Sequence, residues 1–340
     1  MQTMPNKLPG KKKRRFLKAA GFCIITAAAF LLLGIVYQVN SSRRKSIESE
    51  KYIYQCIATQ LNMKDMNQLN DEHFEKVRSF RIEMERVTDI KPVAKLKNLN
   101  LMEFNYDPVS PVDMNIDYGP LEELQNLRQI NFAPWTHDGF VVQEAWYKRI
   151  LRILKKPEPY GSRSKPFDLG KIRKLKRIEM LTVNYNKSYN FEAIANLTNL
   201  WYLSIASPEV SDISFMKGLP KLRQLGIDGT KIKDISPLSG LVNLERLTLT
   251  SAVIKDLNPL ARLTRLQYLR LYSVKVENLD ALSSLTNLNN LDLSYMQIKD
   301  IEPLKKLVNL KELRLKNCEN ISDQQIEDLQ KALPDLKIVR

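Results

Sequence analysis

A period of 22 residues dominates the sequence of this 340-residue chain. Leucines recur at this interval, and most apolar positions around them repeat with it. The C-terminal series comprises Leu222, Leu244, Leu266, Leu288 and Leu310, then Leu225, Leu247, Leu269, Leu291 and Leu313, then Ile227, Leu249, Leu271, Leu293 and Leu315. A unit of this size cannot bury its own apolar face and must stack on its neighbours, so the period predicts a solenoid.

The spacing within one unit predicts a strand followed by a turn. Leu247 and Leu249 are two residues apart, so they share one face of a strand and point inward while Thr248 points out. Pro259 has no N–H group to donate, which excludes a regular strand around it. Residues 256–260 are therefore expected to form a tight turn or a short 3₁₀ helix that returns the chain along the outer side.

The same template extends upstream to Phe80 and Ile82 and gives ten strand segments. Extra residues follow the second strand, and an insertion at residues 133–168 follows the third. The last unit departs from the rule, because Gln324–Leu333 has the pattern of a helix with Asp323 as its N-cap. Leu336 and Ile338 then predict a final short strand.

This repeat resembles the leucine-rich repeat family, specifically its 22-residue bacterial internalin-like class, over roughly residues 50–340. The resemblance implies an α/β solenoid, a horseshoe with a parallel β-sheet on the concave face. It also implies a helical N-terminal cap within residues 41–73, with a short helix at Tyr52–Leu61, ahead of a repeat domain at residues 74–340. Such repeats usually carry asparagine where the chain leaves the strand. Here those positions hold Thr230, Ala252, Val274, Met296 and Cys318, so the usual asparagine ladder is expected to be missing or replaced.

The net charge of +15 is concentrated in two places. Of the 53 Lys and Arg residues, ten lie in residues 1–45, which contain no acid, so 43 remain against 38 Asp and Glu. Residues 148–177 hold twelve basic and two acidic groups. A basic total usually suggests nucleic-acid binding. The concentration in residues 1–45 and in one local patch argues against a nucleic-acid partner.

Residues 19–40 carry no charge and are long enough to cross a bilayer. More positive charge precedes this segment than follows it, which favours a cytoplasmic N-terminus, with residues 1–18 as the basic flank. We therefore expect a retained signal anchor and a single-pass membrane protein, with the repeats on the exoplasmic side, periplasmic or extracellular. A cleaved signal peptide is the alternative.

Alternation along each strand identifies the side chains expected on the concave face. Tyrosine and arginine contribute strongly to interfaces because each combines apolar area with directed hydrogen bonds. The predicted partner-binding residues are Tyr185, Trp201, Tyr202, Arg246, Tyr268, Arg270, Tyr272, Asp292 and Tyr295. Replacing Tyr268, Arg270 and Tyr295 by alanine is expected to abolish partner capture and to leave thermal stability near wild type. The alternative is that such residues simply suit solvent-facing strand positions.

The insertion contains a second candidate, because residues 143–156 have the pattern of one amphipathic helix. Its apolar side holds Val142, Trp146, Ile150, Ile153 and Leu154. The opposite side holds Lys148, Arg149, Arg152, Lys155 and Lys156. Together with Trp146 of the apolar side, these basic residues are the predicted membrane or partner contacts. Such a helix can lie on an anionic membrane or dock its apolar face on the scaffold.

No catalytic or cofactor site is expected. The only two histidines are His73 and His137, and no residues have metal-ligand, nucleophile or phosphate-loop spacing. Asp212, Asp234, Asp256 and Asp300 share one repeat position and are expected to bond the turn backbone. The sequence thus predicts a membrane-anchored leucine-rich repeat protein that binds a protein ligand on its concave face. The alternatives are a cell-envelope module that binds polysaccharide and an intracellular regulatory subunit of an enzyme.

Overall fold

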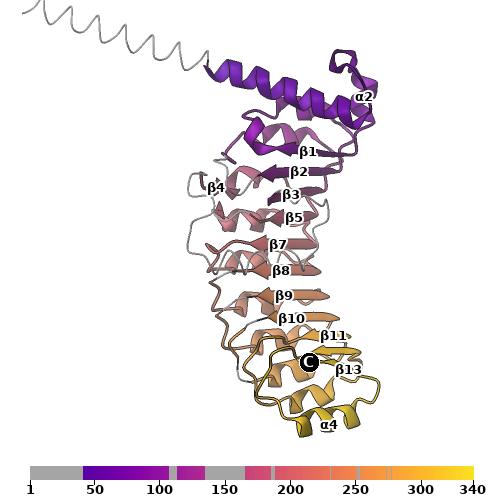
Figure 1. Ribbon diagram of the computed structural model, residues 1–340. Helices are drawn as coiled ribbons and strands as arrows, with labels where there is room; N and C mark the ends of the chain where they lie inside the picture. The colour runs from indigo at the N-terminus through magenta and orange to yellow at the C-terminus, as the bar shows by residue number, and fades with distance from the viewer. Residues whose placement is uncertain are drawn as a thin grey trace, which may run out of the picture.

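The computed structural model describes residues 41–106, 113–134, 165–184, 188–229, 231–250, 253–272, 274–276 and 278–340. They form an elongated stack of coils along an eleven-stranded sheet (Figure 1). The order β1-β2-β3-β5-β7-β8-β9-β10-β11-β12-β13 follows the chain, and every pair is parallel. The predicted ten repeat strands and the final short strand are confirmed. Their bounds are Ser79–Glu83 (β1), Leu101–Tyr106 (β2), Gln129–Pro134 (β3), Met180–Val183 (β5), Tyr202–Ala206 (β7), Gln224–Asp228 (β8), Arg246–Thr250 (β9), Tyr268–Tyr272 (β10), Asn290–Asp292 (β11), Glu312–Arg314 (β12) and Lys337–Val339 (β13).

A second, two-stranded parallel sheet was not predicted. It pairs β4 (Phe167–Asp168), the last two residues of the predicted insertion, with β6 (Ser188–Tyr189). Each strand is too short to show a period, so no pattern in the sequence pointed to this pairing.

Short 3₁₀ helices return the chain after the strands, as predicted. Proline occupies the first turn of several of them, where no backbone N–H is required. Their bounds are Met84–Arg86 (η2), Lys91–Lys95 (η3), Gly119–Glu123 (η4), Leu169–Ile172 (η5), Phe191–Asn196 (η6), Ser214–Gly218 (η7), Ser236–Gly240 (η8), Asn258–Arg262 (η9), Asp280–Ser284 (η10) and Glu302–Lys306 (η11), and a further 3₁₀ helix, Met66–Gln68 (η1), precedes the first strand. The predicted aspartates bond the turns: the carboxylates of Asp212, Asp234, Asp256 and Asp300 accept from the backbone N–H two residues later at 2.7–2.8 Å.

One continuous core runs through the stack. The register aligns Leu225, Leu247, Leu269, Leu291 and Leu313 across five neighbouring strands, and all five are buried. Since each coil covers the leucines of the next, burial depends on the whole stack and not on any single repeat.

An asparagine ladder exists, but it lies ahead of the strands and not at the position where the chain leaves them. Side-chain Nδ2 groups donate to backbone carbonyls of the preceding coil at 2.8–3.1 Å, from Asn98, Asn126, Asn199, Asn243, Asn287 and Asn309. At the expected position Val274, Met296 and Cys318 are buried instead, and the Cys318 thiol donates to the Leu293 carbonyl at 3.1 Å. Thr230 and Ala252 lie outside the described residues.

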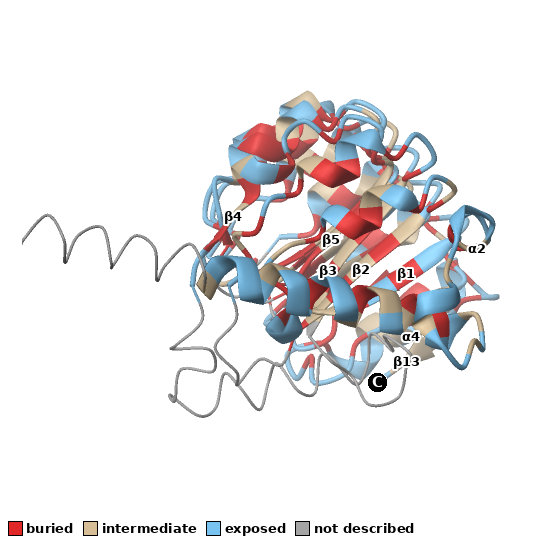
Figure 2. Ribbon diagram, turned by 90° about the horizontal axis from the view of Figure 1, so that it is seen from above, coloured by how far each residue is buried: buried red, intermediate tan, exposed pale blue. Residues whose placement is uncertain are grey.

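Both ends of the stack carry helices. Residues 41–60 are helical and lie across the first coil, where Ile53 and Ile57 are buried in the core (Figure 2). This helix is longer than the predicted Tyr52–Leu61, and the short α2 (Asp71–Glu75) follows it. At the other end, α4 spans Asp323–Ala332.

The predicted N-cap of α4 was wrong by one residue. Ser322 is the N-cap, since its hydroxyl accepts from Gln325 N while the Gln325 side chain accepts from Ser322 N. This reciprocal pair satisfies two backbone donors at once. Asp323, the predicted cap, instead occupies the first helical position.

Three predictions lie outside the described residues: the membrane span 19–40, the helix at residues 143–156 with its basic side chains, and Tyr185. Within the described parts of the chain, no helix is both long and apolar enough to cross a membrane.

Candidate functional site

The face of the large sheet that is turned away from the core, here called the open face, carries six of the predicted partner-binding residues: Tyr202, Arg246, Tyr268, Arg270, Tyr272 and Asp292. The register arranges them in columns that run across the strands. One column holds Tyr202, Gln224, Arg246, Tyr268, Asn290 and Glu312, and the next holds Ser204, Gly226, Thr248, Arg270, Asp292 and Arg314. The alternation read from the leucines therefore brings side chains from six repeats onto one surface.

Arg246 and Tyr268 form the central pair of the first column. The Arg246 guanidinium carbon lies 4.5 Å from the centroid of the Tyr268 ring, within the range of a cation–π contact. Arg246 is exposed and Tyr268 is half-buried. The pair thus presents a fixed guanidinium edge beside an aromatic surface, a combination suited to contact with a protein surface.

Trp201 and Tyr202 form an aromatic pair. Tyr202 is the first residue of β7, and Trp201 directly precedes it. Their rings meet edge to face, with centroids 6.1 Å apart, and both side chains are partly exposed. Trp201 also lines a hollow of about 560 Å³ with Arg223 and Glu245, whose charged groups are 3.8 Å apart. These two predicted residues are accessible to a ligand.

Tyr272 was predicted to be exposed, and this was wrong: it is 8% exposed. The ring of Tyr295 covers it, with centroids 4.7 Å apart. Tyr295 itself is 40% exposed and has a left-handed backbone (φ 64°), a conformation uncommon for residues other than glycine. The pair therefore offers one accessible ring, that of Tyr295, supported by a second one.

Asp292 was also predicted to be available to a partner, and it is buried, at 5% exposure. One carboxylate oxygen accepts from Arg270 Nε at 2.9 Å and the other accepts from the Ser294 backbone N–H at 3.0 Å. Asp292 and Arg270 therefore hold neighbouring strands together. The Arg270 guanidinium, one-fifth exposed, belongs to this internal pair as much as to the surface.

The same network continues to Asp228, at the end of β8. The Thr250 hydroxyl donates to Asp228 Oδ1 at 2.5 Å. Burial raises the pKa of the Asp228 carboxyl, an effect that the Thr250 hydrogen bond and the Arg270 charge only partly offset. Thr250 was not among the predicted site residues. The repeat period could have identified Thr250, because it lies 22 residues from both Asp228 and Tyr272 and therefore shares their repeat position.

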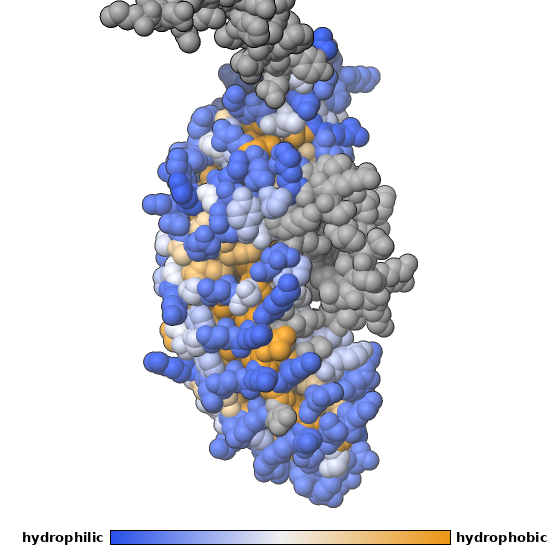
Figure 3. All heavy atoms as spheres, turned by 90° about the vertical axis from the view of Figure 1, so that its left-hand side faces the viewer, coloured by the Kyte–Doolittle hydropathy of each residue, from blue (hydrophilic) through white to orange (hydrophobic). Residues whose placement is uncertain are grey.

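Apolar surface is not confined to the open face. Figure 3 shows apolar side chains reaching the surface between hydrophilic ones along one flank of the stack. The large apolar side chains that are exposed among the described residues are Ile47, Tyr189, Val242, Val253, Tyr295 and Val308. Only Tyr295 of these was predicted to contact a partner.

Comparison with known proteins identifies the repeat. Residues 264–306 and 286–331 match the family model for leucine-rich repeats (two copies). No sequence match to a curated protein was found.

Solved structures with the same architecture come from several kinds of protein. The functional domain of InlJ from Listeria monocytogenes matches at 15% identity and a TM-score of 0.50, over 84% of this chain and 67% of that one. TLR13, in a complex with ssRNA13, matches at 16% identity and a TM-score of 0.50, over 80% and 45% of the two chains. Internalin InlF from L. monocytogenes matches at 22% identity and a TM-score of 0.49, over 85% and 94%. At such identities a likeness shows the fold alone: the chain folds as a leucine-rich repeat solenoid, and residues 264–331 carry the repeat of that family.

Proposed function

We propose that this protein binds a protein partner on the open face of its sheet, which corresponds to the concave face of leucine-rich repeat proteins. The observation that carries the proposal is the accessible set Arg246, Tyr268 and Tyr295, each held in place by a neighbouring ring or guanidinium group. Side chains fixed before binding lose little conformational entropy in a complex. Eleven strands at roughly 4.8 Å spacing give a surface about 50 Å long, which is large enough for a folded partner.

A triple variant of these residues tests the proposal better than one that includes Arg270, whose removal would also disturb the fold. Arg246→Ala/Tyr268→Ala/Tyr295→Ala is expected to weaken partner capture at least about 30-fold, because truncating a single hot spot costs about 2 kcal/mol or more. Capture would be measured from envelope extracts of the source cells and then with the captured protein purified.

The matched control replaces three exposed residues outside the strands, Val242, Lys255 and Val308, by alanine. We expect this control to bind as wild type does. Equal binding by the open-face variant and the control would reject the open face as the binding surface.

Polysaccharide binding is the second candidate, and the hollow beside Trp201 favours it. An indole next to charged and amide groups can stack on a sugar ring while those groups bond its hydroxyls. Trp201→Ala would then abolish binding to a glycan array, whereas the Arg246/Tyr268/Tyr295 variant would lose only protein capture. If the wild-type protein binds no glycan on the array, polysaccharide binding is rejected and protein binding remains.

We further propose that residues 19–40 anchor the protein in a membrane with the repeats on the exoplasmic side. The support is the uncharged sequence of that segment and the excess of positive charge before it. A reporter active only outside the cytoplasm, fused after Arg340, is expected to be active. Activity of a cytoplasmic reporter at the same position would contradict the anchor and favour the alternative of an intracellular regulatory subunit.

A further inference from the structure

A groove on the flank of the solenoid, here called the flank groove, has an apolar wall. It encloses about 860 Å³ where β6 and η6 face the loop that precedes η7. Tyr189, Phe191, Val210 and Phe215 supply the apolar lining, and the rings of Phe191 and Phe215 stack with centroids 6.3 Å apart. Tyr189 is 44% exposed although it is aromatic. Val210 and Phe215 are buried, so the accessible apolar surface of the groove belongs to Tyr189 and Phe191.

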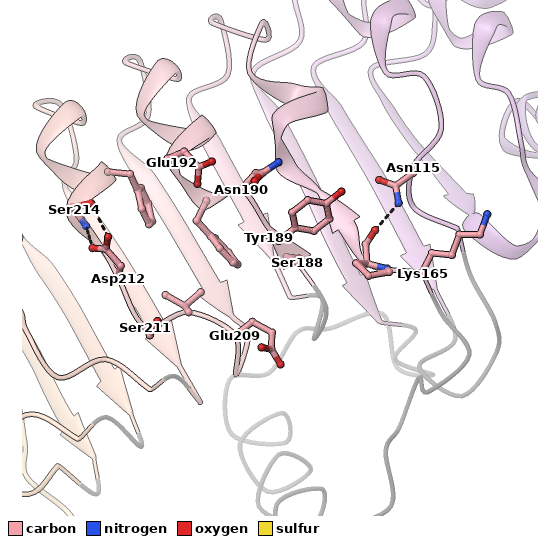
Figure 4. Close-up of a pocket in the computed structure, with 14 residues that line it drawn as sticks. Asn115, Lys165, Ser188, Tyr189, Asn190, Glu192, Glu209, Ser211, Asp212 and Ser214 are labelled. Atoms are coloured by element: carbon pink, nitrogen blue, oxygen red, sulfur yellow. Dashed lines mark hydrogen bonds between the residues drawn. The ribbon is translucent and has the colours of Figure 1, made fainter.

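The rim of the flank groove is acidic. Glu192, Glu209 and Asp212 lie around the apolar side chains (Figure 4). Among the described residues no basic side chain forms an ion pair with Glu192 or Glu209, and both are at least partly exposed. Asp212 is fixed by the backbone N–H and hydroxyl of Ser214. The groove thus combines an apolar wall with three carboxylates, so a cationic, amphipathic occupant suits it.

The chain itself returns beside this groove. Lys165 and Pro166 belong to its lining, at the end opposite Asp212 and Ser214 (Figure 4). Asn115 Nδ2 donates to the Pro166 carbonyl at 2.5 Å, and pairing of β4 with β6 fixes the residues that follow. Lys156 is nine residues before Lys165, so at about 3.3–3.6 Å per residue it can lie no more than roughly 30 Å from this anchored point. Chain length therefore allows the residues around Lys156 to reach the groove.

We propose that the flank groove binds residues 142–156 of this same chain. These residues lie outside the described parts, and their sequence supplies the match. Five basic side chains (Lys148, Arg149, Arg152, Lys155 and Lys156) complement the acidic rim. Five apolar ones (Val142, Trp146, Ile150, Ile153 and Leu154) complement the apolar wall.

An intramolecular occupant is favoured over an anionic membrane for two reasons. A tether of a few residues gives the segment a millimolar effective concentration at the groove. An acidic rim also repels an anionic lipid surface, so a segment beside this rim finds opposite charge on the protein before it finds it on a bilayer. In this proposal residues 142–156 cover the flank groove at the level of β5 and β7.

Hydrogen exchange on the full-length protein tests the proposal. The groove variant Glu192→Lys/Glu209→Lys leaves Asp212 in place, because that carboxylate supports its own turn. Amides of residues 142–156 are expected to exchange about tenfold faster in this variant than in wild type, because two attractive pairs become repulsive. The matched control, Glu319→Lys/Asp335→Lys, makes the same charge change at exposed positions near the C-terminus and should leave the exchange unchanged.

A charge swap separates docking from a general effect of the variant. Adding Arg149→Glu/Arg152→Glu to the groove variant is expected to restore part of the protection. Slow exchange of amides in β8, β9 and β10 reports that each variant is folded. Equal protection of residues 142–156 in the groove variant, absence of protection in wild type, or protection that appears only with phosphatidylglycerol vesicles would each overturn the proposal.

Discussion

Replacing Leu247 by alanine is expected to lower the free energy of unfolding by about 2–5 kcal/mol, the range measured for buried leucines. Leu247 has no exposed surface, and its strand β9 lies between β8 and β10, where Leu225 and Leu269 occupy the same register position. The cost arises from lost apolar burial and from a cavity that the neighbouring coils cannot close without shifting. Denaturation in urea, followed by circular dichroism, measures it.

Val242→Ala is the control for this prediction. Val242 lies in the same repeat but is 46% exposed, so its truncation should change stability by no more than about 0.5 kcal/mol. Equal stability of the two variants would mean that the coils do not share a continuous core, which would contradict the solenoid.

Arg270→Ala is expected to lower the free energy of unfolding by about 3 kcal/mol, because it leaves the Asp292 carboxylate buried without its partner. This reverses the expectation from the sequence, in which Arg270 was an exposed contact residue whose loss spared stability. The effect is placed at the lower end of the range for buried pairs, since Arg270 is one-fifth exposed and Arg314 lies beside Asp292 in the adjacent strand.

A double-mutant cycle identifies the cause. The cycle tests whether the cost comes from the unpaired Asp292 carboxylate. In that case the loss in free energy of unfolding of Arg270→Ala/Asp292→Ala is smaller, by about 1–3 kcal/mol, than the sum of the losses of the two single variants. Purely additive losses would show that the pair contributes no coupling and that Arg270 acts through its packing alone.

Much of the architecture follows from features within a single repeat. Leu247 and Leu249 predict an inward strand face because strand geometry alternates, and Pro259 predicts the 3₁₀ return because it lacks a donor. Asp256 predicts the bonded turn for a local reason as well, since its carboxylate reaches the N–H two residues along. In each case the cause lies in neighbouring residues of the chain, so the sequence pattern is enough to predict the result.

Contacts between repeats could not be predicted in the same way. Whether Tyr272 is exposed depends on Tyr295, 23 residues later, and whether Asp292 is available depends on Arg270, 22 residues earlier. Alternation assigns a side chain to a face of the sheet but does not say what its neighbours on that face will cover. The N-cap of α4 failed for a smaller reason, because a reciprocal bond between Ser322 and Gln325 outweighed the simple preference for aspartate.

The strict 22-residue period is enough to predict the stacked coils, the parallel strands, their register and the identity of the side chains on the open face, because it leaves one way to bury the leucines. The folded chain was needed to show which of those side chains are accessible, where the asparagine ladder runs, and that β4 and β6 pair beside an acidic groove. Those outcomes depend on distances between side chains of different coils, and such distances are fixed only when the coils have stacked.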